Sequence, residues 1–354
     1  MTTNTYNSIL SEMQSSPSNW LVTGAAGFIG SNLVEFLLQN NQFVIGIDNF
    51  STGYQRNLDD IKNNLDEKLW KNFHFHNLDI REIEDCKKAF NSIFNLKAQS
   101  IDFVLHQAAI GSVPRSIEDP VFSHSNNISG FLNVLLCAKE HEVKKFVYAS
   151  SSSVYGDEAS LPKIEPKIGN LLSPYALTKL TNELYAQVFS LNYDIKTVGL
   201  RYFNVFGPRQ DPNGAYAAVI PKWISRFIQN KTVEIYGDGE TTRDFCYIEN
   251  VIQANILAAM SSSKIEGDQV FNIAVGDQIN LMDLALLIKE NLKKYKISSN
   301  FQIEKADFRK GDIRHSLADI SKAKKFLSYD PAYTVQMGLK KSMHWYLNTE
   351  TKID

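Results

Sequence analysis

Short apolar runs alternate with helical patterns from residue 20 to about residue 203. The runs at 20–24, 43–48, 73–79, 101–107, 146–151 and 197–203 have the length and residue content of strands. Stretches with helical spacing, such as 31–40 and 129–141, lie between them. Strands that are apolar on both faces and alternate with helices predict an α/β fold, a doubly wound parallel sheet of the Rossmann type covered on both sides.

The pattern changes after about Asn204, where Pro and Gly become frequent and the predicted elements become shorter. We therefore expect a larger domain over 20–203 and a smaller α/β C-terminal domain over 204–354. The segment 243–262 reads as a strand, a turn and a helix that return to the larger domain. Residues 1–19 are polar, and we interpret them as an N-terminal extension that packs on the surface or frays.

Composition and charge exclude several classes of function. The chain has 354 residues, of which 44% are hydrophobic and 21% charged, with a net charge of -2 and a pI of about 6.4. This balance gives no general attraction to nucleic acid or to an anionic membrane. The N-terminus lacks a basic start and an apolar block, and no run reaches the ~18 apolar residues of a spanning helix. We expect a cytoplasmic protein without membrane insertion or a nucleic-acid partner.

Cysteine and histidine spacing predicts neither disulfides nor a zinc site. Cys86, Cys137 and Cys246 are far apart and read as reduced residues of a cytosolic protein. His74 and His76 alternate within FHFHN, which indicates a plain strand, with metal binding as the alternative. We therefore predict no metal.

The strand at 20–24 leads into GAAGFIG (24–30) and then into a helix. Glycines in this context let the backbone approach a pyrophosphate, and the helix N-terminus supplies N–H donors. Asp48 ends the next strand, where a carboxylate binds ribose hydroxyls and repels a 2′-phosphate. These features predict an NAD site rather than an NADP site. Two roles remain open for Asp79, at the end of the third strand: it could contact adenine, or it could cap the following helix.

Tyr175 and Lys179 lie four residues apart in SPYALTK, in a helix that Ser173 and Pro174 begin. Residues at this spacing share one helix face. We expect Lys179 to lower the pKa of Tyr175 from about 10 towards neutrality, which would make Tyr175 a proton-transfer group.

GAAGFIG, the serines at 150–153 and YALTK together resemble the extended short-chain dehydrogenase/reductase family. HQAA (106–109), NNISGFLN (126–133), RYFNVFGPRQ (201–210) and YGDGETTRDFCYIEN (236–250) extend the likeness over nearly the whole chain. Within the family the sequence is most similar to the UDP-sugar 4-epimerases, above all to the branch acting on UDP-GlcNAc and UDP-GlcNAcA in polysaccharide biosynthesis. The resemblance implies an NAD-binding domain at 20–203 and a UDP-sugar-binding domain at 204–354.

The resemblance also implies the site residues. The catalytic residues would be Tyr175 as base, Lys179 as its electrostatic partner and a serine at Ser151, with Ser152 and Ser153 left open because the serine run makes the register ambiguous. The cofactor residues would be Gly24, Gly27, Phe28, Ile29, Gly30, Asp48, Asn49, Ser51, Thr52, Gly53, Asp79, Ile80, Gln107, Ala108, Ala109, Asn127, Tyr175, Lys179, Tyr202 and Val205. The substrate residues would be Gly111, Ser151, Ser153, Asn204, Ala218, Val219, Ile220, Pro221, Tyr236, Arg243, Arg309, Asp312 and Ser316.

The same comparison narrows the reaction. Dehydratases of the family carry an Asp–Glu pair where this chain has Ser152 and Ser153, and the related decarboxylases carry a Glu there. Oxidation and reduction at one carbon remain, as in a 4-epimerase. Ser316 stands where epimerases restricted to UDP-glucose carry a tyrosine, and Gly111 replaces a long side chain, so both imply room for a 2-acetamido group. Whether C6 is a hydroxymethyl or a carboxylate stays open.

Three alternatives remain beside an epimerase of UDP-N-acetylhexosamines. They are a UDP-glucose 4-epimerase, another NAD(P)-dependent nucleotide-sugar oxidoreductase such as a reductase, and a non-catalytic NAD-sensing protein. The family likeness further implies that the helices at about 129–141 and 174–191 keep an apolar face and pair across a two-fold axis into a four-helix bundle, giving a homodimer.

Overall fold

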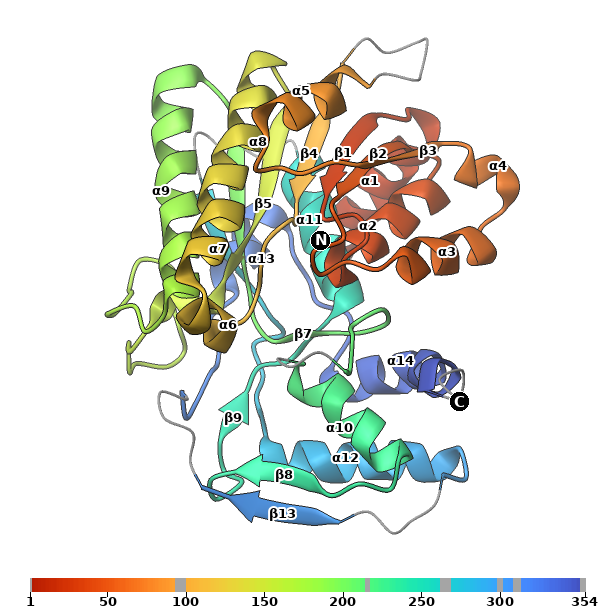
Figure 1. Cartoon of the computed structure of the whole chain (residues 1–354), viewed down its shortest axis with the longest axis vertical. Coiled ribbons are helices and arrows are strands. Elements are labelled where there is room, and N and C mark those ends of the chain that lie inside the picture. The colour runs from red at the N-terminus through yellow and green to blue at the C-terminus, as the bar shows by residue number, and fades with distance from the viewer. Residues whose placement is uncertain are drawn as a thin grey trace.

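A parallel sheet with helices on both faces forms the larger lobe of the molecule, and a smaller lobe lies at one end of it (Figure 1). The computed structural model describes residues 2–92, 100–213, 217–261, 269–297, 302–307 and 313–350. The main sheet contains β1 (Asn19–Thr23), β2 (Phe43–Asp48), β3 (Phe73–Asn77), β4 (Phe103–His106), β5 (Lys145–Ser151), β6 (Thr197–Tyr202) and β11 (Gln269–Ile273). Shorter pairs are β7 (Val205–Phe206) with β10 (Cys246–Tyr247), β8 (Val233–Tyr236) with β13 (Ile303–Ala306), and β9 (Thr242–Arg243) with β12 (Ile279–Asn280).

The helices of the described residues are distributed over both lobes. Those before the smaller lobe are α1 (Thr2–Ser15), α2 (Phe28–Gln39), α3 (Gln55–Asn64), α4 (Glu67–Trp70), α5 (Ile83–Asn91), α6 (Val113–Glu118), α7 (Pro120–His124), α8 (Gly130–Glu140) and α9 (Pro174–Tyr193). Those after it begins are α10 (Val219–Ile228), α11 (Ile248–Met260), α12 (Leu281–Lys294), α13 (Ser321–Leu327) and α14 (Val335–Glu350). A π-helical turn (Ser125–Ser129) precedes α8, and a 3₁₀ turn (Ser152–Tyr155) follows β5.

The order of the strands across the main sheet is β11-β6-β5-β4-β1-β2-β3. Every neighbouring pair in it is parallel. The strand order reverses between β1 and β4, and ligands of doubly wound sheets bind at such a reversal, beyond the carboxyl ends of the strands. The predicted Rossmann-type α/β fold is confirmed.

Alternate residues of each central strand enter different cores, because side chains of a strand point to opposite faces. Trp20 and Val22 pack in the core that contains α2 and α11, whereas Leu21 packs in the core beneath α5, α8 and α9. In β5, Val147 faces the first core and Phe146 the second. Apolar burial on both faces explains why the strands read as continuous apolar runs.

Two parts of the chain agree with the sequence-based prediction only in part. The predicted return of 243–262 to the larger lobe is present as α11, which packs on β5 and β6, but β11 also joins the sheet and α13 packs on it. Of the two alternatives for the N-terminal extension, packing is found and fraying is not, although the helix was not predicted. The extension forms α1, whose Ile9 and Met13 are buried and which contacts α11.

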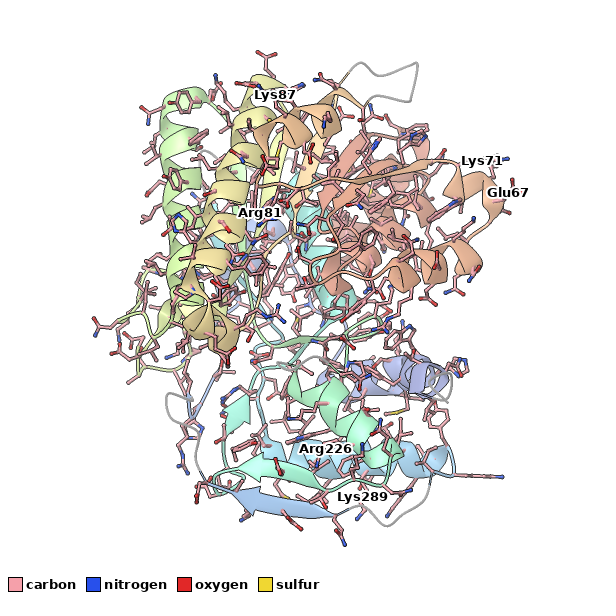
Figure 2. All side chains as sticks on the ribbon, in the orientation of Figure 1. Glu67, Lys71, Arg81, Lys87, Arg226 and Lys289 are labelled. Atoms are coloured by element: carbon pink, nitrogen blue, oxygen red, sulfur yellow. The ribbon has the colours of Figure 1, made fainter. Side chains whose placement is uncertain are left out.

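The smaller lobe is built on α10, α12 and α14, with β8 and β13 along its outer side (Figure 1). Trp223, Phe227 and Leu284 fill its interior, which is continuous with the α2 and α11 core. Exposed charged pairs lie at the periphery of the molecule, as Glu67 on α4 and the adjoining Lys71 do (Figure 2), whereas the Glu183–Arg201 pair is buried. Exposed pairs of this kind contribute little to stability, so the two cores hold the fold together.

Cys86, Cys137 and Cys246 are buried and unpaired. His74 and His76 lie on β3, as the strand reading predicts. Within the described part of the chain, no three His, Cys, Asp or Glu side chains converge in a way that could hold a metal ion. Among the same residues, no helix has the length and apolar content needed to cross a membrane.

Candidate active site

The glycine loop between β1 and α2 is packed too closely against neighbouring backbone for side chains at Gly24 and Gly30. Gly24 has a φ of +69°, and a Cβ on it would lie 2.8 Å from the Ala108 nitrogen. A Cβ on Gly30 would lie 2.0 Å from the Gly24 oxygen. Gly27 occupies the N-cap of α2 and offers no side-chain cap to the first-turn amides. These amides and the positive end of the helix dipole therefore form a place suited to a phosphate group.

Asp48 faces this loop from the end of β2. Its Oδ2 accepts a hydrogen bond from the Ala26 amide at 3.0 Å, and its Oδ1 accepts one from the Phe50 amide at 2.8 Å. Burial raises the pKa of the Asp48 carboxyl, and the backbone amides act against that rise. The carboxylate thus fixes the loop and lines the cavity where a ribose of a dinucleotide would lie.

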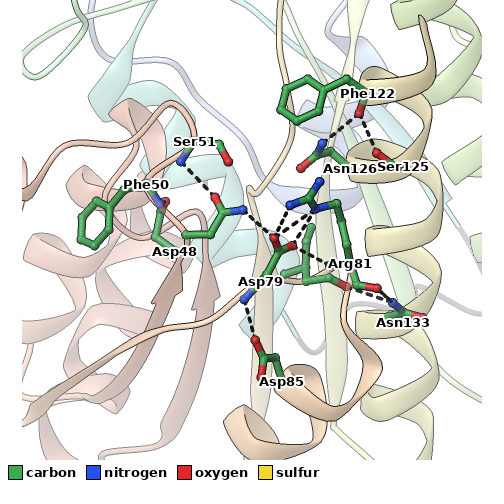
Figure 3. Close-up of polar contacts among 12 residues, drawn as sticks. Asp48, Phe50, Ser51, Asp79, Arg81, Asp85, Phe122, Ser125, Asn126 and Asn133 are labelled. Carbon is green, nitrogen blue, oxygen red and sulfur yellow. Dashed lines mark hydrogen bonds and ion pairs between the residues drawn. The ribbon is translucent and has the colours of Figure 1, made fainter.

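Asp79 belongs to a cluster that joins the loop after β2 to the loop after β3 (Figure 3). Its carboxylate accepts hydrogen bonds from Asn49 Nδ2 at 3.0 Å and from Arg81 Nη2 at 2.6 Å. The Arg81 hydrogen bonds lower the pKa of Asp79 to about 2. Glu82, not Asp79, occupies the N-cap of α5, so the helix-cap reading of Asp79 is wrong, and the adenine reading stays a prediction.

Tyr175, Ser151 and Lys179 meet where β5 ends beside α9. Ser173 caps α9 by accepting from the Ala176 amide at 3.1 Å, and Pro174 is the first helical residue, as predicted. The Tyr175 phenol is hydrogen-bonded to Ser151. Lys179 Nζ lies 5.9 Å from the centre of the Tyr175 ring and donates to the Ala149 carbonyl at 2.8 Å.

The electrostatics of this cluster differ from the sequence-based expectation. Burial raises the pKa of Tyr175, and the hydrogen bond with Ser151 only opposes that rise. The prediction that Lys179 brings the pKa of Tyr175 down towards neutrality is therefore wrong for this structure. The reason is desolvation, which disfavours both charged forms and also lowers the pKa of Lys179 to about 8, while Glu183 acts in the opposite direction on Lys179.

The three serine candidates occupy different positions. Ser151 lines the cavity and contacts the phenol, whereas Ser152 and Ser153 are not among the lining residues. Ser153 Oγ instead donates to Ser151 Oγ at 2.9 Å. Ser153 thus holds the Ser151 hydroxyl through a hydrogen bond, and the geometry favours Ser151 as the serine that a substrate would contact.

A cavity of about 570 Å³ runs from the glycine loop to this cluster. The predicted residues that line it are Gly24, Gly27, Phe28, Ile29, Gly30, Asp48, Asn49, Ser51, Thr52, Ile80, Gln107, Ala108, Ala109, Gly111, Ser151, Tyr175, Lys179, Tyr202, Asn204, Val205 and Ala218. Gly53, Asp79 and Asn127 do not line it. Asn127 is buried and ties Ile110 to Thr178 through its amide group.

An adjoining cavity in the smaller lobe is lined by six of the thirteen predicted substrate residues. Its lining includes Asn204, Ala218, Val219, Ile220, Tyr236 and Arg243, and it shares Asn204 and Ala218 with the first cavity. Pro221 lies in α10 and is not among the lining residues. Ser316 is half-buried beside β9, where its amide donates to the Thr242 carbonyl at 3.2 Å. Arg309 and Asp312 lie outside the described residues.

Several residues of the cavity wall were missed by the sequence analysis. Tyr54, Ser112, Arg115, Asn126 and Asp211 all line it. The Tyr54 hydroxyl donates to Asp211 at 2.6 Å across 157 positions of sequence. Such a contact has no local signal. Ser112 has a φ of +91°, but serine rarely marks a left-handed position, so sequence alone does not reveal it.

Comparison with known proteins agrees with this arrangement. Residues 20–274 match the NAD dependent epimerase/dehydratase family. A putative UDP-glucose 4-epimerase of Methanocaldococcus jannaschii is 36% identical over 93% of this chain and 98% of its own length.

Two solved structures are also similar. The UDP-N-acetylglucosamine 4-epimerase from Methanobrevibacter ruminantium M1, in complex with UDP-N-acetylmuramic acid, shares 36% identity with a TM-score of 0.82, over 94% of this chain and 99% of that one. The UDP-glucuronic acid 4-epimerase from Bacillus cereus, in complex with UDP-glucuronic acid and NAD, shares 33% identity with a TM-score of 0.80 over the same fractions. The match over residues 20–274 and these likenesses along nearly the whole chain show that the protein belongs to the NAD dependent epimerase/dehydratase family, among its UDP-sugar 4-epimerases.

Proposed function

We propose that this protein interconverts the 4-epimers of UDP-N-acetylhexosamines, UDP-GlcNAc with UDP-GalNAc or the corresponding uronic acids UDP-GlcNAcA with UDP-GalNAcA. One observation carries the proposal. Tyr175, hydrogen-bonded to Ser151 and backed by the buried Lys179, faces the cavity that begins at the glycine loop. A proton-transfer group thus lies at the end of a dinucleotide cavity, next to the cavity of the smaller lobe.

NAD is the cofactor, and the residues of the chain fit it. Gly24 and Gly30 have no room for a Cβ. Because they carry none, the backbone amides of the loop stay open to a pyrophosphate. The Asp48 carboxylate lies where it repels a 2′-phosphate. NAD, when bound, supplies the acceptor and donor of hydride for C4 of the sugar, and its positive charge favours the phenolate form of a neighbouring tyrosine.

The residues of the chain supply the proton transfer. Tyr175 takes the proton of the 4-hydroxyl as C4 is oxidised, and Ser151 holds the same oxygen by a hydrogen bond. The 4-keto sugar then turns while the uridine diphosphate stays bound. Tyr175 returns the proton to the same oxygen when C4 is reduced from its opposite face. A single base serves both directions, because the proton leaves and rejoins one atom.

Substrate binding combines residues of both lobes. Arg243 lines the cavity of the smaller lobe, and a guanidinium suits the geometry of a diphosphate. We propose Arg309 and Asp312 as further contacts to the diphosphate and the uridine ribose, on family likeness alone. In this scheme residues 20–203 bind NAD and residues 204–354 bind the UDP-sugar, with α11, β11 and α13 returning to the larger lobe.

The proposal of an N-acetylated substrate rests on the room that the site leaves for a 2-acetamido group. A Cβ on Gly111 would meet no atom within 4 Å, so the cavity is open at this point. Ser316 places a small side chain beside β9 but is not among the residues that line either cavity, so its part in selecting the acetamido group rests on family likeness. The similar enzyme from Methanobrevibacter ruminantium acts on UDP-N-acetylglucosamine. The similarity to UDP-glucuronic acid 4-epimerase keeps a C6 carboxylate as a second candidate.

Incubation with UDP-GlcNAc, UDP-GlcNAcA, UDP-glucose and UDP-glucuronate, each without added NAD, tests the proposal. We expect the 4-epimer of an N-acetylated substrate to form to equilibrium, as resolved by NMR, and Tyr175→Phe to abolish it. Turnover of UDP-glucose alone would favour the UDP-glucose 4-epimerase reading. A requirement for added NAD(P)H in every turnover would favour a reductase.

Assembly into a homodimer is part of this proposal. Leu177, Leu184, Val188 and Leu191 lie 50–78% exposed along α9, beside α8, and such an apolar face is typical of a helix-pair interface. Leu184→Lys should then convert a dimer into monomers in sedimentation. A wild-type monomer at micromolar concentration would contradict the assignment.

We further propose a cytoplasmic role in surface polysaccharide synthesis, such as that of O-antigen.

A further inference from the structure

Helix α9 carries a third ionisable residue on the face that holds Tyr175 and Lys179. Glu183 follows Lys179 by four residues, as Lys179 follows Tyr175, so the three side chains lie one above another. Glu183 is 6% exposed and Lys179 is 2% exposed. A carboxylate at such a depth is costly unless it is paired, so its retention needs an explanation.

Three hydrogen bonds fix the Glu183 carboxylate from two strands. Arg201 on β6 donates to both oxygens, through Nε at 2.9 Å and Nη2 at 2.7 Å. Ser150 on β5 donates its hydroxyl to Oε1. Ser150 lies between two residues of the catalytic cluster. The carbonyl of Ala149 accepts a hydrogen bond from Lys179, and Ser151 is hydrogen-bonded to Tyr175. The carboxylate therefore ties α9 to the strand segment that holds the two catalytic candidates.

Arg201 is itself held on its other side. Its Nη1 donates to the Glu165 carbonyl at 2.9 Å, and its guanidinium lies 4.9 Å from the ring centre of Tyr155. The Tyr155 hydroxyl donates to Asn272 Oδ1 at 2.6 Å, on β11. The ion pair is thus anchored to strands β5, β6 and β11, which fixes Glu183 on the face of α9 that also carries Lys179.

The charged groups around Lys179 give Glu183 an electrostatic role as well. Burial lowers the pKa of Lys179 to about 8, and Glu183 is the charged group that opposes this. His106 on β4 is the other titratable neighbour, and burial lowers its pKa to about 3, so it is neutral at pH 7. Tyr175 is the remaining group on this face of α9, and β5 faces Lys179 with the Ala149 carbonyl.

We propose that Glu183, clamped by Arg201 and Ser150, is a positioning residue that keeps Lys179 in place and in its ammonium form beneath Tyr175. The proposal rests on the proposed function, because it assigns Glu183 to the same proton transfer. A cation 5.9 Å from the Tyr175 ring favours the phenolate more than a neutral amine would, although it does not outweigh the burial that raises the pKa of Tyr175. Without the carboxylate, Lys179 would lose its proton at lower pH, and the base would lose its cationic partner.

Glu183→Gln tests this through the pH dependence of kcat. Removal of the carboxylate lowers the pKa of Lys179, so the alkaline limb of the profile should move to lower pH by about half a unit or more. A half-unit displacement should lower kcat by about 2-fold at pH 8 and by up to about 3-fold at higher pH, because that fraction of the ammonium form is lost. Glu183→Asp, which keeps the charge, should recover part of the alkaline limb. An alkaline limb at the wild-type position in an active Glu183→Gln protein would overturn the proposal.

A double variant separates positioning from simple damage to the fold. Glu183→Gln leaves Arg201 buried without its partner, whereas Glu183→Gln/Arg201→Gln removes both charges and should recover melting temperature. The alkaline limb of the double variant should stay displaced. Its return to the wild-type position would show that the unpaired arginine, not the missing carboxylate, caused the effect, and would overturn the proposal.

Glu35→Gln is a matched control. Glu35 is also ion-paired with a buried arginine, Arg209, but lies on α2, outside the α9 cluster. It should leave the pH profile unchanged, and an equal displacement would overturn a specific role of Glu183. Absence of 4-epimerisation by the wild-type protein on any UDP-sugar would instead contradict the proposed function, so the two failures are distinguishable.

Discussion

The two ends of the cavity are built in different ways. At the cofactor end, contacts are set by backbone, with Gly24 and Gly30 in close approach and Asp48 bound to the amides of the same loop. At the sugar end, side chains from distant segments converge, among them Arg243 on β9 and residues before α10. The backbone contacts of the cofactor end suit one ligand shape. At the sugar end, a single side-chain substitution can alter which ligand is bound.

Tyr175 lies at the junction of the two ends, and its loss should give the largest effect. Tyr175→Phe should keep the fold and the bound NAD but lower kcat by ~100-fold or more, because the general base is lost. Turnover and NAD absorbance of the purified protein measure this. Tyr193→Phe, which removes the same hydroxyl from an exposed position of α9, should behave as wild type. Near-wild-type turnover of Tyr175→Phe would remove the basis of the assignment.

Ser316→Tyr addresses the sugar end alone. A phenol beside β9 should fill space that the turning N-acetylated sugar needs, since a packed pocket does not absorb such a volume without strain. We expect kcat/KM for UDP-GlcNAc relative to UDP-glucose to fall by ~10-fold or more. Because the readout is a ratio, general damage does not imitate it. Equal losses on both substrates would mean that Ser316 does not select the acetamido group.

Gly30→Ala addresses the cofactor end alone. The added Cβ would lie 2.0 Å from the Gly24 oxygen, so the loop has to open. We expect a loss of ~1–3 kcal/mol in stability, as for other overpacked sites, and loss of NAD on purification. Melting temperature and cofactor content measure the two effects. Gly111→Ala, whose Cβ meets open space, should retain both; a Gly30→Ala protein that also retains both would refute the close-packed account of the loop.

Asp48 should give the smallest of these effects. NAD should bind the apoprotein ~10-fold or more tightly than NADP, since the carboxylate repels the 2′-phosphate. Asp48→Asn keeps the shape of the side chain and should narrow that ratio in a titration calorimetry experiment. Equal affinity of the wild-type apoprotein for NAD and NADP would contradict the role given to this strand end.

The sequence revealed the cofactor end more fully than the sugar end, for physical reasons. Strand ends, glycines and the Tyr175–Lys179 spacing are local patterns, and local geometry largely determines where such residues lie. The Tyr54–Asp211 contact and the place of β11 in the sheet depend on pairings between distant segments, which leave no periodic signal. Helix α1 was missed because few apolar residues, Ile9 and Met13 among them, mark its buried face. The sign of the pKa shift at Tyr175 was missed because desolvation depends on the whole fold.

Oxidation and reduction at one carbon, with the hydride returned to that carbon, is the central claim. Its most direct test uses UDP-GlcNAc deuterated at C4, in ordinary water and without added NAD. We predict that UDP-GalNAc forms with the deuterium retained at C4, because the label passes to the retained cofactor and back to the opposite face of the sugar. Epimerisation with loss of the deuterium to solvent would contradict the account, since it would require removal of a proton from C4 rather than transfer of a hydride.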